Sequence, residues 1–168
     1  MKTSFKSFIT IGLMAISFAS QAQKIAFIEL DSLLSLTPEM IEAKKASADY
    51  YKQLESTIAD MQKELNGKNA EYQNNEKTYT DLIKQTKQKE LQDINQRLQD
   101  FQQQAQVDFQ KKNVELMKPI NDKAKKAIEK VAKAKGYKIV LDTSPGGVLY
   151  YEPSDDIFLL VKAELGIK

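Results

Sequence analysis

Residues 39–135 constrain the fold of this chain most, because they contain only one proline, Pro119, and one glycine, Gly67. Most of the other residues are Lys, Glu, Gln, Ala and Leu, which favour helix. Apolar residues recur at heptad-like spacing, which is typical of a coiled coil. They form three runs: Tyr51, Leu54, Ile58, Met61, Leu65, Tyr72, Tyr79 and Leu82; Leu91, Ile94, Leu98, Phe101 and Ala105; and Met117, Ile120, Ala124, Ala127 and Val131.

Short apolar segments flank this helical region and predict strands at residues 25–30, 137–142 and 148–151. A strand of this length is not stable alone. A continuous helix would be roughly 150 Å long and would keep the first strand away from the other two. We therefore expect the helix to fold back on itself, with its tip within residues 74–88, where turn-forming and helix-capping residues occur.

Capping residues mark the expected ends of the helices. Thr37 before Pro38 is typical of a helix start, and Gly136 is typical of a helix end. Residues 31–36 are expected to form one or two helical turns. We interpret Asp155 and Asp156 as caps of a final helix at residues 157–165 rather than as ligands of calcium, because the EF-hand spacing is absent.

Together these elements predict an α+β fold that is mainly helical. A small β body is expected from residues 23–37 and 136–168, and a long antiparallel coiled-coil hairpin from residues 38–135. One hairpin and three short strands bury little apolar surface, and the strand edges stay open. The sequence therefore favours self-association through the β body.

Residues 1–22 have the pattern of a cleavable secretory signal peptide. Lys2 and Lys6 precede an uncharged apolar run at residues 8–19, and Ser20-Gln21-Ala22 is a small-x-small cleavage site. The apolar run is too short to span a bilayer as a helix. Without the two lysines the formal net charge falls from +2 to zero, so the basic precursor charge does not indicate a nucleic-acid partner.

The composition excludes several classes of function. The chain has no cysteine and no histidine, so thiolate nucleophiles, the usual general base and the commonest zinc ligands are missing. The Gly67-Lys68 pair lacks the other residues of a phosphate-binding loop. Arg97 is the only arginine, and base recognition favours arginine. We therefore expect no enzyme activity, no cofactor, no metal and no nucleic-acid binding.

Three segments resemble one protein family. KIAFIELDSLL follows the signal segment, LQDINQRLQDFQQQAQ lies in the helical region, and GYKIVLDTSPGGVLYYEPSDDIFLLVKAELG closes the chain. These segments resemble the Skp/OmpH family of periplasmic chaperones. The resemblance implies a homotrimer whose helical hairpins project as tentacles around a cavity. It also implies an ATP-independent holdase for unfolded outer-membrane proteins. Family members are often basic, so the neutral mature chain leaves membrane or lipopolysaccharide contact open.

Two sets of candidate functional residues follow from the pattern. Apolar residues beside or off the heptad runs are expected to face the client: Ile41, Tyr50, Ile83, Val107 and Phe109. Apolar residues of the predicted strands are expected in the core of the trimeric body: Ile25, Phe27, Ile28, Ile139, Leu141, Val148 and Tyr150. The alternative function is a structural coiled-coil spacer or tether of the cell envelope, which would have no affinity for unfolded chains.

Overall fold

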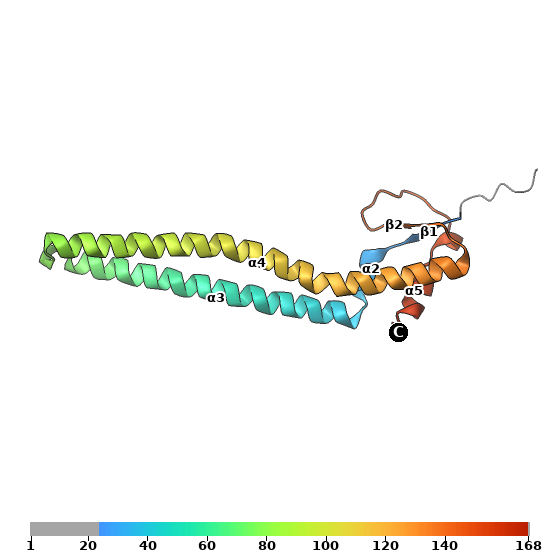
Figure 1. Ribbon diagram of the computed structural model, residues 1–168, viewed down its shortest axis with the longest axis horizontal. Helices are drawn as coiled ribbons and strands as arrows, with labels where there is room; N and C mark the ends of the chain where they lie inside the picture. Colours follow the sequence, from blue (N-terminus) through green and yellow to red (C-terminus); the bar gives the residue numbers. More distant parts are fainter. Residues whose placement is uncertain (1–23, 168) are drawn as a thin grey trace, which may run out of the picture. The chain divides into compact units, whose positions relative to one another are not determined.

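The structure of the chain, a computed structural model, describes residues 24–167 (Figure 1). The predicted signal peptide, residues 1–22, lies outside the described residues. The elements follow in the order β1 (Ile25–Ile28), α2 (Leu30–Ser35), α3 (Pro38–Asn75), η1 (Glu76–Thr78), α4 (Asp81–Lys135), β2 (Ile139–Asp142), η2 (Pro153–Asp155) and α5 (Phe158–Glu164). The expected mainly helical fold with a small sheet is confirmed.

The chain divides into two compact units. The hairpin unit comprises Asp31–Lys126, and the strand unit comprises the described residues up to Leu30 together with Ala127–Gly166. The last turns of α4 therefore belong with the strands, whereas the sequence pattern placed the boundary after Lys135.

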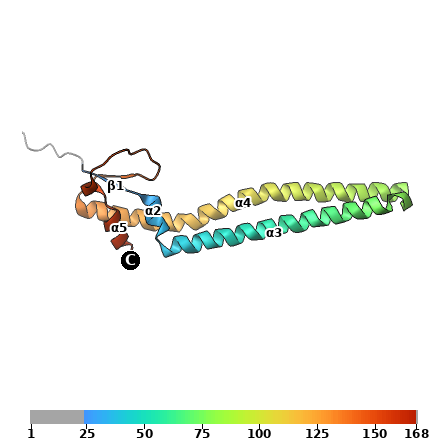
Figure 2. The same ribbon diagram turned by 180° about the vertical axis from the view of Figure 1, so that it is seen from behind.

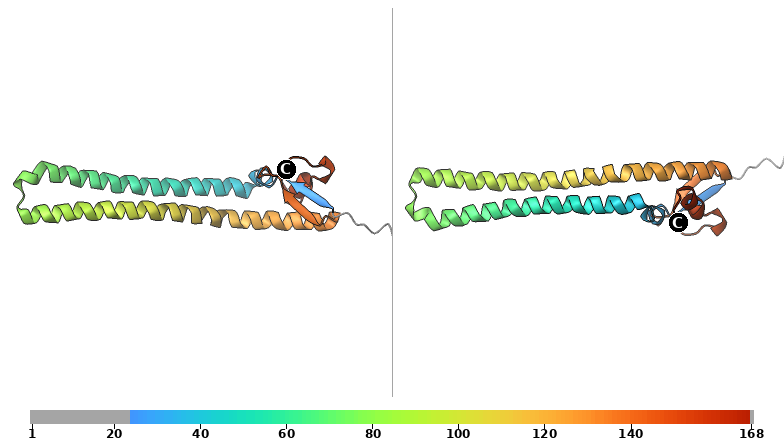
Figure 3. Two further views of the ribbon diagram at one scale, coloured as in Figure 1. Left: turned by 90° about the horizontal axis from the view of Figure 1, so that it is seen from above. Right: turned by 90° about the horizontal axis from the view of Figure 1, so that it is seen from below.

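In the hairpin unit, α3 and the first part of α4 run side by side in opposite directions (Figure 3). The Thr37 hydroxyl caps α3 by accepting a hydrogen bond from the backbone amide of Met40 at 3.2 Å. Residues 76–80 connect the helices and lie within the range predicted for the tip. Thr80 caps α4, because its hydroxyl accepts from the amide of Ile83 at 3.4 Å.

The heptad runs of α4 supply most of the buried surface. Ile94, Leu98, Ala105, Ile120 and Ala124 are all buried, as the periodicity predicts. The α3 run differs, because its side chains are mostly half-exposed and only Tyr72 is buried. Two positions contradict the predicted pattern outright, since Tyr51 is 48% exposed and Leu82 is 74% exposed.

Pro119 lies inside α4 without ending the helix. At the helix end, Gly136 adopts a φ of 76°, a conformation that glycine reaches without steric penalty.

In the strand unit, β1 (labelled in Figure 2) pairs in parallel with β2, with Ile25 opposite Ile139 and Ile28 opposite Asp142. The other edge of β1 is also used, because Phe27 forms an isolated parallel bridge with Asp156. The Phe27 carbonyl accepts a hydrogen bond from the amide of Ile157 at 2.9 Å. The outer edge of β2 has no strand partner among the described residues.

Asp142 ties the end of β2 to the start of α2. Its carboxylate accepts hydrogen bonds from the backbone amides of Ser144 at 2.9 Å and Leu30 at 3.2 Å. Partial burial raises the pKa of Asp142, but these hydrogen bonds outweigh burial and leave the pKa below its ordinary value.

The predicted strand at residues 148–151 is wrong, because these residues have no regular structure. Strand-forming side chains need a neighbouring edge for their backbone hydrogen bonds. Both edges of β1 are engaged within the chain, by β2 and by Asp156, and residues 148–151 do not pair with the outer edge of β2, which stays open among the described residues. Leu149 is 97% exposed, and Tyr151 stacks on Phe27 with ring centroids 4.7 Å apart.

The final helix starts one residue later than predicted, at Phe158. The N-cap position is Ile157 and not Asp155 or Asp156 as predicted, although the carboxylate of Asp156 accepts a hydrogen bond from the amide of Phe158 at 2.7 Å. Ile157 and Val161 are completely buried and anchor this end of the chain.

Candidate functional site

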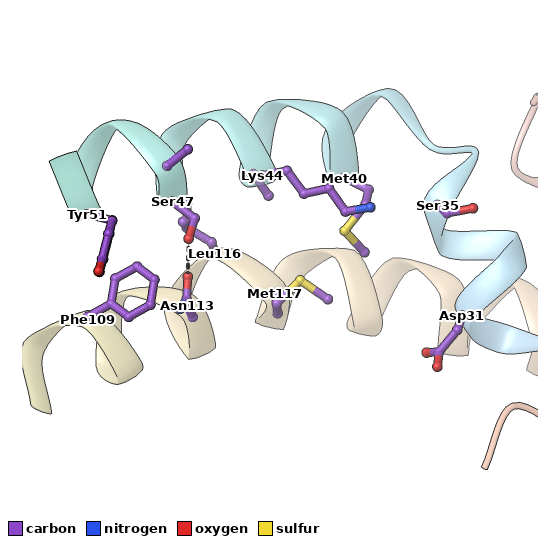
Figure 4. A pocket seen from close by; sticks show the side chains of 12 residues that line it. Asp31, Ser35, Met40, Lys44, Ser47, Tyr51, Phe109, Asn113, Leu116 and Met117 are labelled. Atoms are coloured by element: carbon purple, nitrogen blue, oxygen red, sulfur yellow. Dashed lines mark hydrogen bonds between the residues drawn. The ribbon is translucent and has the colours of Figure 1, made fainter. Parts of the chain in front are cut away.

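An apolar groove lies between the first half of α3 and the facing part of α4. Its larger cavity has a volume of about 600 Å³. Figure 4 shows side chains from both helices converging on it, with Met40 and Met117 on opposite sides. The lining residues are Asp31, Ser35, Met40, Ala43, Lys44, Ser47, Ala48, Tyr51, Phe109, Asn113, Leu116 and Met117.

A second cavity of about 380 Å³ continues this groove toward the hairpin tip. The two cavities share Tyr51 and Phe109 in their linings. The second is also lined by Leu54, Glu55, Ile58, Gln102, Ala105 and Gln106. We call both cavities together the hairpin groove.

The Tyr51 and Phe109 rings stand where the two cavities meet. Their centroids are 5.3 Å apart and their planes are inclined by 60°, which is a favourable geometry for an aromatic pair. A hydrogen bond from Tyr51 to the Glu55 carboxylate raises the pKa of the Tyr51 hydroxyl. The two rings therefore stand between the two cavities of the groove. The polar atom of the pair is the Tyr51 hydroxyl, which bonds to Glu55.

One polar contact crosses the apolar surface. The Ser47 hydroxyl donates to the side-chain oxygen of Asn113 at 2.6 Å, and both residues are half-buried (Figure 4). The side-chain nitrogen of Asn113 has no hydrogen-bond acceptor among residues 24–167, and it is not fully buried. The groove therefore offers a hydrogen-bond donor beside apolar walls.

The distal half of the hairpin adds ion pairs between α3 and α4 to its buried apolar side chains. Lys68 contacts Glu90 at 2.7 Å and Lys87 contacts Glu71 at 2.9 Å. These lysines hold the pKa values of Glu90 and Glu71 below the ordinary value. The cavity in this half is lined mainly by charged residues, Glu64, Lys89, Glu90, Asp93 and Arg97 among them.

The distal contacts also include a buried tyrosine. The Tyr72 hydroxyl accepts a hydrogen bond from the side-chain nitrogen of Gln88 at 2.8 Å. The hairpin groove itself lies in the half of the hairpin nearer α2.

Of the residues that the sequence suggested for client contact, Phe109 lines the groove. Ile41, Val107 and Ile83 are exposed, at 64%, 58% and 42%, and Tyr50 is half-buried. None of these four lines the groove.

Sequence reasoning missed the apolar residues on the groove walls. Met40 and Leu116 belong to no predicted heptad run. Tyr51 and Met117 belong to predicted runs, whose residues were expected to be buried between the helices. The sequence holds one signal of the groove. The heptad phase changes between the run that ends at Ala105 and the run that begins at Met117.

The predicted body residues are distributed unevenly in the strand unit. Ile28 is buried, and Ile25, Phe27 and Val148 are half-buried. Ile139, Leu141 and Tyr150 are exposed at 41%, 40% and 76%. The inner strand β1 is therefore covered within the chain, whereas β2 and the following loop present apolar side chains to the outside.

The described residues offer little other functional chemistry. Across residues 24–167, no three His, Cys, Asp or Glu side chains come together in a way that could hold a metal ion. Every helix in the same range falls short of the length and apolar character that a membrane-spanning segment needs.

Comparison with known proteins identifies the family. A crystal structure from Caulobacter crescentus CB15, assigned as a candidate outer membrane chaperone (OmpH-like), matches with a TM-score of 0.73 and 14% sequence identity. The match covers 86% of this chain and 84% of that one, which establishes similarity of fold. No curated protein matches the chain. A family model described as outer membrane protein (OmpH-like) matches residues 24–165. The chain therefore belongs to the OmpH-like family, as its sequence segments indicated.

Proposed function

We propose that this protein is an ATP-independent holdase chaperone of the periplasm, which binds unfolded outer-membrane proteins and prevents their aggregation. Family membership and the fold shared with a candidate outer membrane chaperone support this role. The predicted signal peptide supports export. The observation that carries the proposal is the hairpin groove, an apolar opening between two helices that are otherwise joined by buried apolar side chains and by ion pairs.

The side chains of the groove suit a varied client. Methionine is unbranched and polarizable, so Met40 and Met117 can adjust to apolar side chains of different shape. The Tyr51–Phe109 pair offers aromatic surface that remains partly accessible. Contacts of this kind are individually weak, which allows release without nucleotide hydrolysis when the client inserts or folds.

We further propose that the chain acts as a homotrimer, the state implied by the family. The outer edge of β2 is unpaired among the described residues, and Leu149 and Tyr150 beside it are exposed. Pairing of this edge with another copy would bury these residues and remove an aggregation-prone edge. Three hairpins would then surround one cavity, toward which Ile41 and Val107 supply additional apolar contacts.

Light scattering of a denatured outer-membrane barrel protein, diluted from urea into buffer, tests the chaperone role. We expect the mature chain to suppress scattering at a near-stoichiometric ratio of trimer to client, without ATP. A spacer or tether of the cell envelope would leave scattering unchanged, and that result would contradict the proposal. A folded soluble protein in place of the client controls for nonspecific binding. It should not co-elute with the chaperone during gel filtration.

A further inference from the structure

We infer that charged side chains in the distal half of the hairpin select the register in which α3 and α4 pair. Three ion pairs across the hairpin form this device: Glu64 with Arg97, Lys68 with Glu90, and Glu71 with Lys87. They determine which residues of the two helices face each other, and hence where the tip and the hairpin groove lie. This inference goes beyond the proposed function and does not depend on what the protein binds.

The contacts between α3 and α4 follow one register along the hairpin. Three uncharged pairs join the helices: Ser47 with Asn113, Tyr51 with Phe109, and Tyr72 with Gln88. The two residue numbers have the same sum in all three pairs, and the sums of the three ion pairs differ from it by only one or two. The antiparallel helices of Figure 3 therefore keep one alignment from Ser47 to the tip.

The apolar seams alone do not fix this alignment. Apolar residues recur in both helices at alternating intervals of about three and four residues. A slip of one helix past the other by one heptad therefore brings apolar positions opposite apolar positions again. Good helix formers also continue on both sides of the tip. Another feature of the sequence must separate the observed register from its two nearest alternatives.

A slip by one heptad in the first direction brings like charges together. Lys68 would face Arg97 instead of Glu90, so that two positive charges meet. Glu71 would face Ile94, which is 2% exposed in the observed register. Like charges at contact distance repel each other, and a carboxylate beside a buried apolar side chain loses hydration without gaining a partner. Both effects disfavour this register.

A slip in the opposite direction is disfavoured by charge of the other sign. Glu64 would face Glu90 instead of Arg97, so that two negative charges meet. Tyr51 would then face Gln102, and the aromatic pair of the hairpin groove would be lost. The same charged residues thus disfavour both slips, one through its positive charges and the other through its negative charges.

Lys68 has a further property of a register-selecting residue. It lies between Leu65 and Tyr72 in the α3 run, at a position where the heptad spacing calls for an apolar side chain. A single lysine in such a seam specifies register while lowering stability. Among the three registers, only the observed one gives Lys68 a carboxylate partner, Glu90 at 2.7 Å. Exposed ion pairs stabilise a fold little, but the choice between registers depends only on the difference between them.

Disulfide trapping in the complete mature protein tests the register. The chain has no cysteine, so each introduced pair of cysteines reports one contact. Ser47→Cys with Asn113→Cys reports the observed register, because these two side chains touch. Ser47→Cys with Gln106→Cys reports the slip that brings Glu64 to Glu90. In the observed register Gln106 lies one heptad away from Asn113, about 10 Å along the helix, which is too far for a disulfide.

Glu64→Lys together with Lys68→Leu should shift the hairpin toward this slipped register. In the observed register the new lysine would repel Arg97 and Glu90 would lose Lys68. In the slipped register the new lysine would meet Glu90 and the new leucine would meet Ile83. After a short pulse of oxidant, the crosslinked fraction of the slipped pair should rise about tenfold over the same cysteines in the otherwise unchanged protein. No rise in a folded variant would overturn the inference. Crosslinks between copies are separated by mass on a denaturing gel.

Glu64→Lys with Arg97→Glu is the matched control, because it exchanges the two charges of one pair and keeps their attraction in the observed register. It should crosslink as the unchanged protein does. A slip in this variant would show that the loss of Glu64, and not the arrangement of charges, controls the register. Circular dichroism verifies that each variant keeps its helices.

Arg97→Glu alone provides a second test with the opposite sign, which also serves if the first variant does not fold. Its new glutamate would repel Glu64 in the observed register and attract Lys68 after the slip in the first direction. Ser47→Cys with Ile120→Cys reports that slip, and its crosslinked fraction should rise. If this fraction stays unchanged, or if the hairpin slips in the other direction, the charges do not select the register.

Discussion

Tyr51 of α3 and Phe109 of α4 face each other across the helical hairpin, with their ring centroids 5.3 Å apart. The pair holds the helices together at the point where the two cavities of the hairpin groove meet. Because Tyr51 is 48% exposed, the pair is also available to a ligand. We propose that structural support and client contact coincide at this position, and the two roles can be separated by mutation.

Tyr51→Ala is expected to weaken chaperone activity more than it weakens the fold. The side chain is half-exposed, so its loss should lower the free energy of unfolding by only about 1 kcal/mol. The same loss removes aromatic surface from the groove, so severalfold more protein should be needed to suppress aggregation. Urea unfolding and light scattering measure the two effects.

Tyr79→Ala is the matched control, because Tyr79 pairs with Tyr72 in the distal half of the hairpin, with centroids 6.3 Å apart. This variant should lose similar stability and keep its activity. Equal loss of activity in both variants would mean that Tyr51 acts only through the stability of the hairpin.

Thr37→Ala should loosen the start of α3. Thr37 is 3% exposed; its hydroxyl accepts from the amide of Met40 and donates to the carbonyl of Leu34 at 2.7 Å. Loss of a threonine N-cap typically costs about 1 kcal/mol. Hydrogen exchange should become faster in the first turn of α3, whereas Thr37→Ser, which keeps the hydroxyl, should restore most of the protection. Unchanged exchange in the alanine variant would show that Pro38 alone suffices to start the helix.

The distal half of the hairpin should loosen at acidic pH. Lys68 and Lys87 lower the pKa values of Glu90 and Glu71 below 4.5, so these carboxylates bind protons more weakly in the folded state than in the unfolded one. The stability that they contribute is present above about pH 4.5 and is lost as the pH falls through the lowered values. Hydrogen exchange near Tyr72 should therefore accelerate between pH 5 and pH 3 relative to the intrinsic rate.

The variant Glu90→Gln controls for the ion pair, because it removes one charge and should reduce this pH dependence. The effect is expected to be small, since all four side chains are partly exposed to solvent. If the Glu90→Gln variant responds to pH as strongly as the unmodified protein, groups other than Glu90 cause the response.

Leu149→Ser distinguishes an isolated chain from an assembly. Leu149 is 97% exposed within the chain, so its replacement would not destabilise a monomer. If another copy covers this residue, the variant should melt at a lower temperature and dissociate at a higher protein concentration. Analytical ultracentrifugation and melting curves over a hundredfold range of concentration measure both effects. Val114→Ser, at another exposed apolar position, should change neither. A melting temperature independent of concentration would contradict assembly.

The sequence predicted those parts of the fold that depend on local chemistry. Thr37 with Pro38 marks the start of α3, and Gly136 marks the end of α4, because caps act through backbone groups a few residues away. The buried seam of α4 follows from helical periodicity alone. Even the position of the tip follows from the turn and capping preferences around Thr80.

The groove could not be predicted in the same way. Periodicity shows which side chains face the partner helix, but it does not show how closely the helices approach. Tyr51 satisfies the heptad spacing, yet it remains half-exposed because its partner Phe109 is displaced from the α4 seam. Residues 148–151 do not form the predicted strand although the outer edge of β2 is open, because strand propensity alone does not decide which edge a segment pairs with.

The central claim is that clients occupy the hairpin groove, and physical obstruction of the groove tests it most directly. The chain contains no cysteine, so Ala48→Cys in the groove lining and Asp49→Cys beside it can each be labelled uniquely with a bulky maleimide. We predict that labelled Ala48→Cys no longer suppresses aggregation of a denatured outer-membrane barrel protein, while its unlabelled form and labelled Asp49→Cys remain active. Full activity of labelled Ala48→Cys would contradict the account.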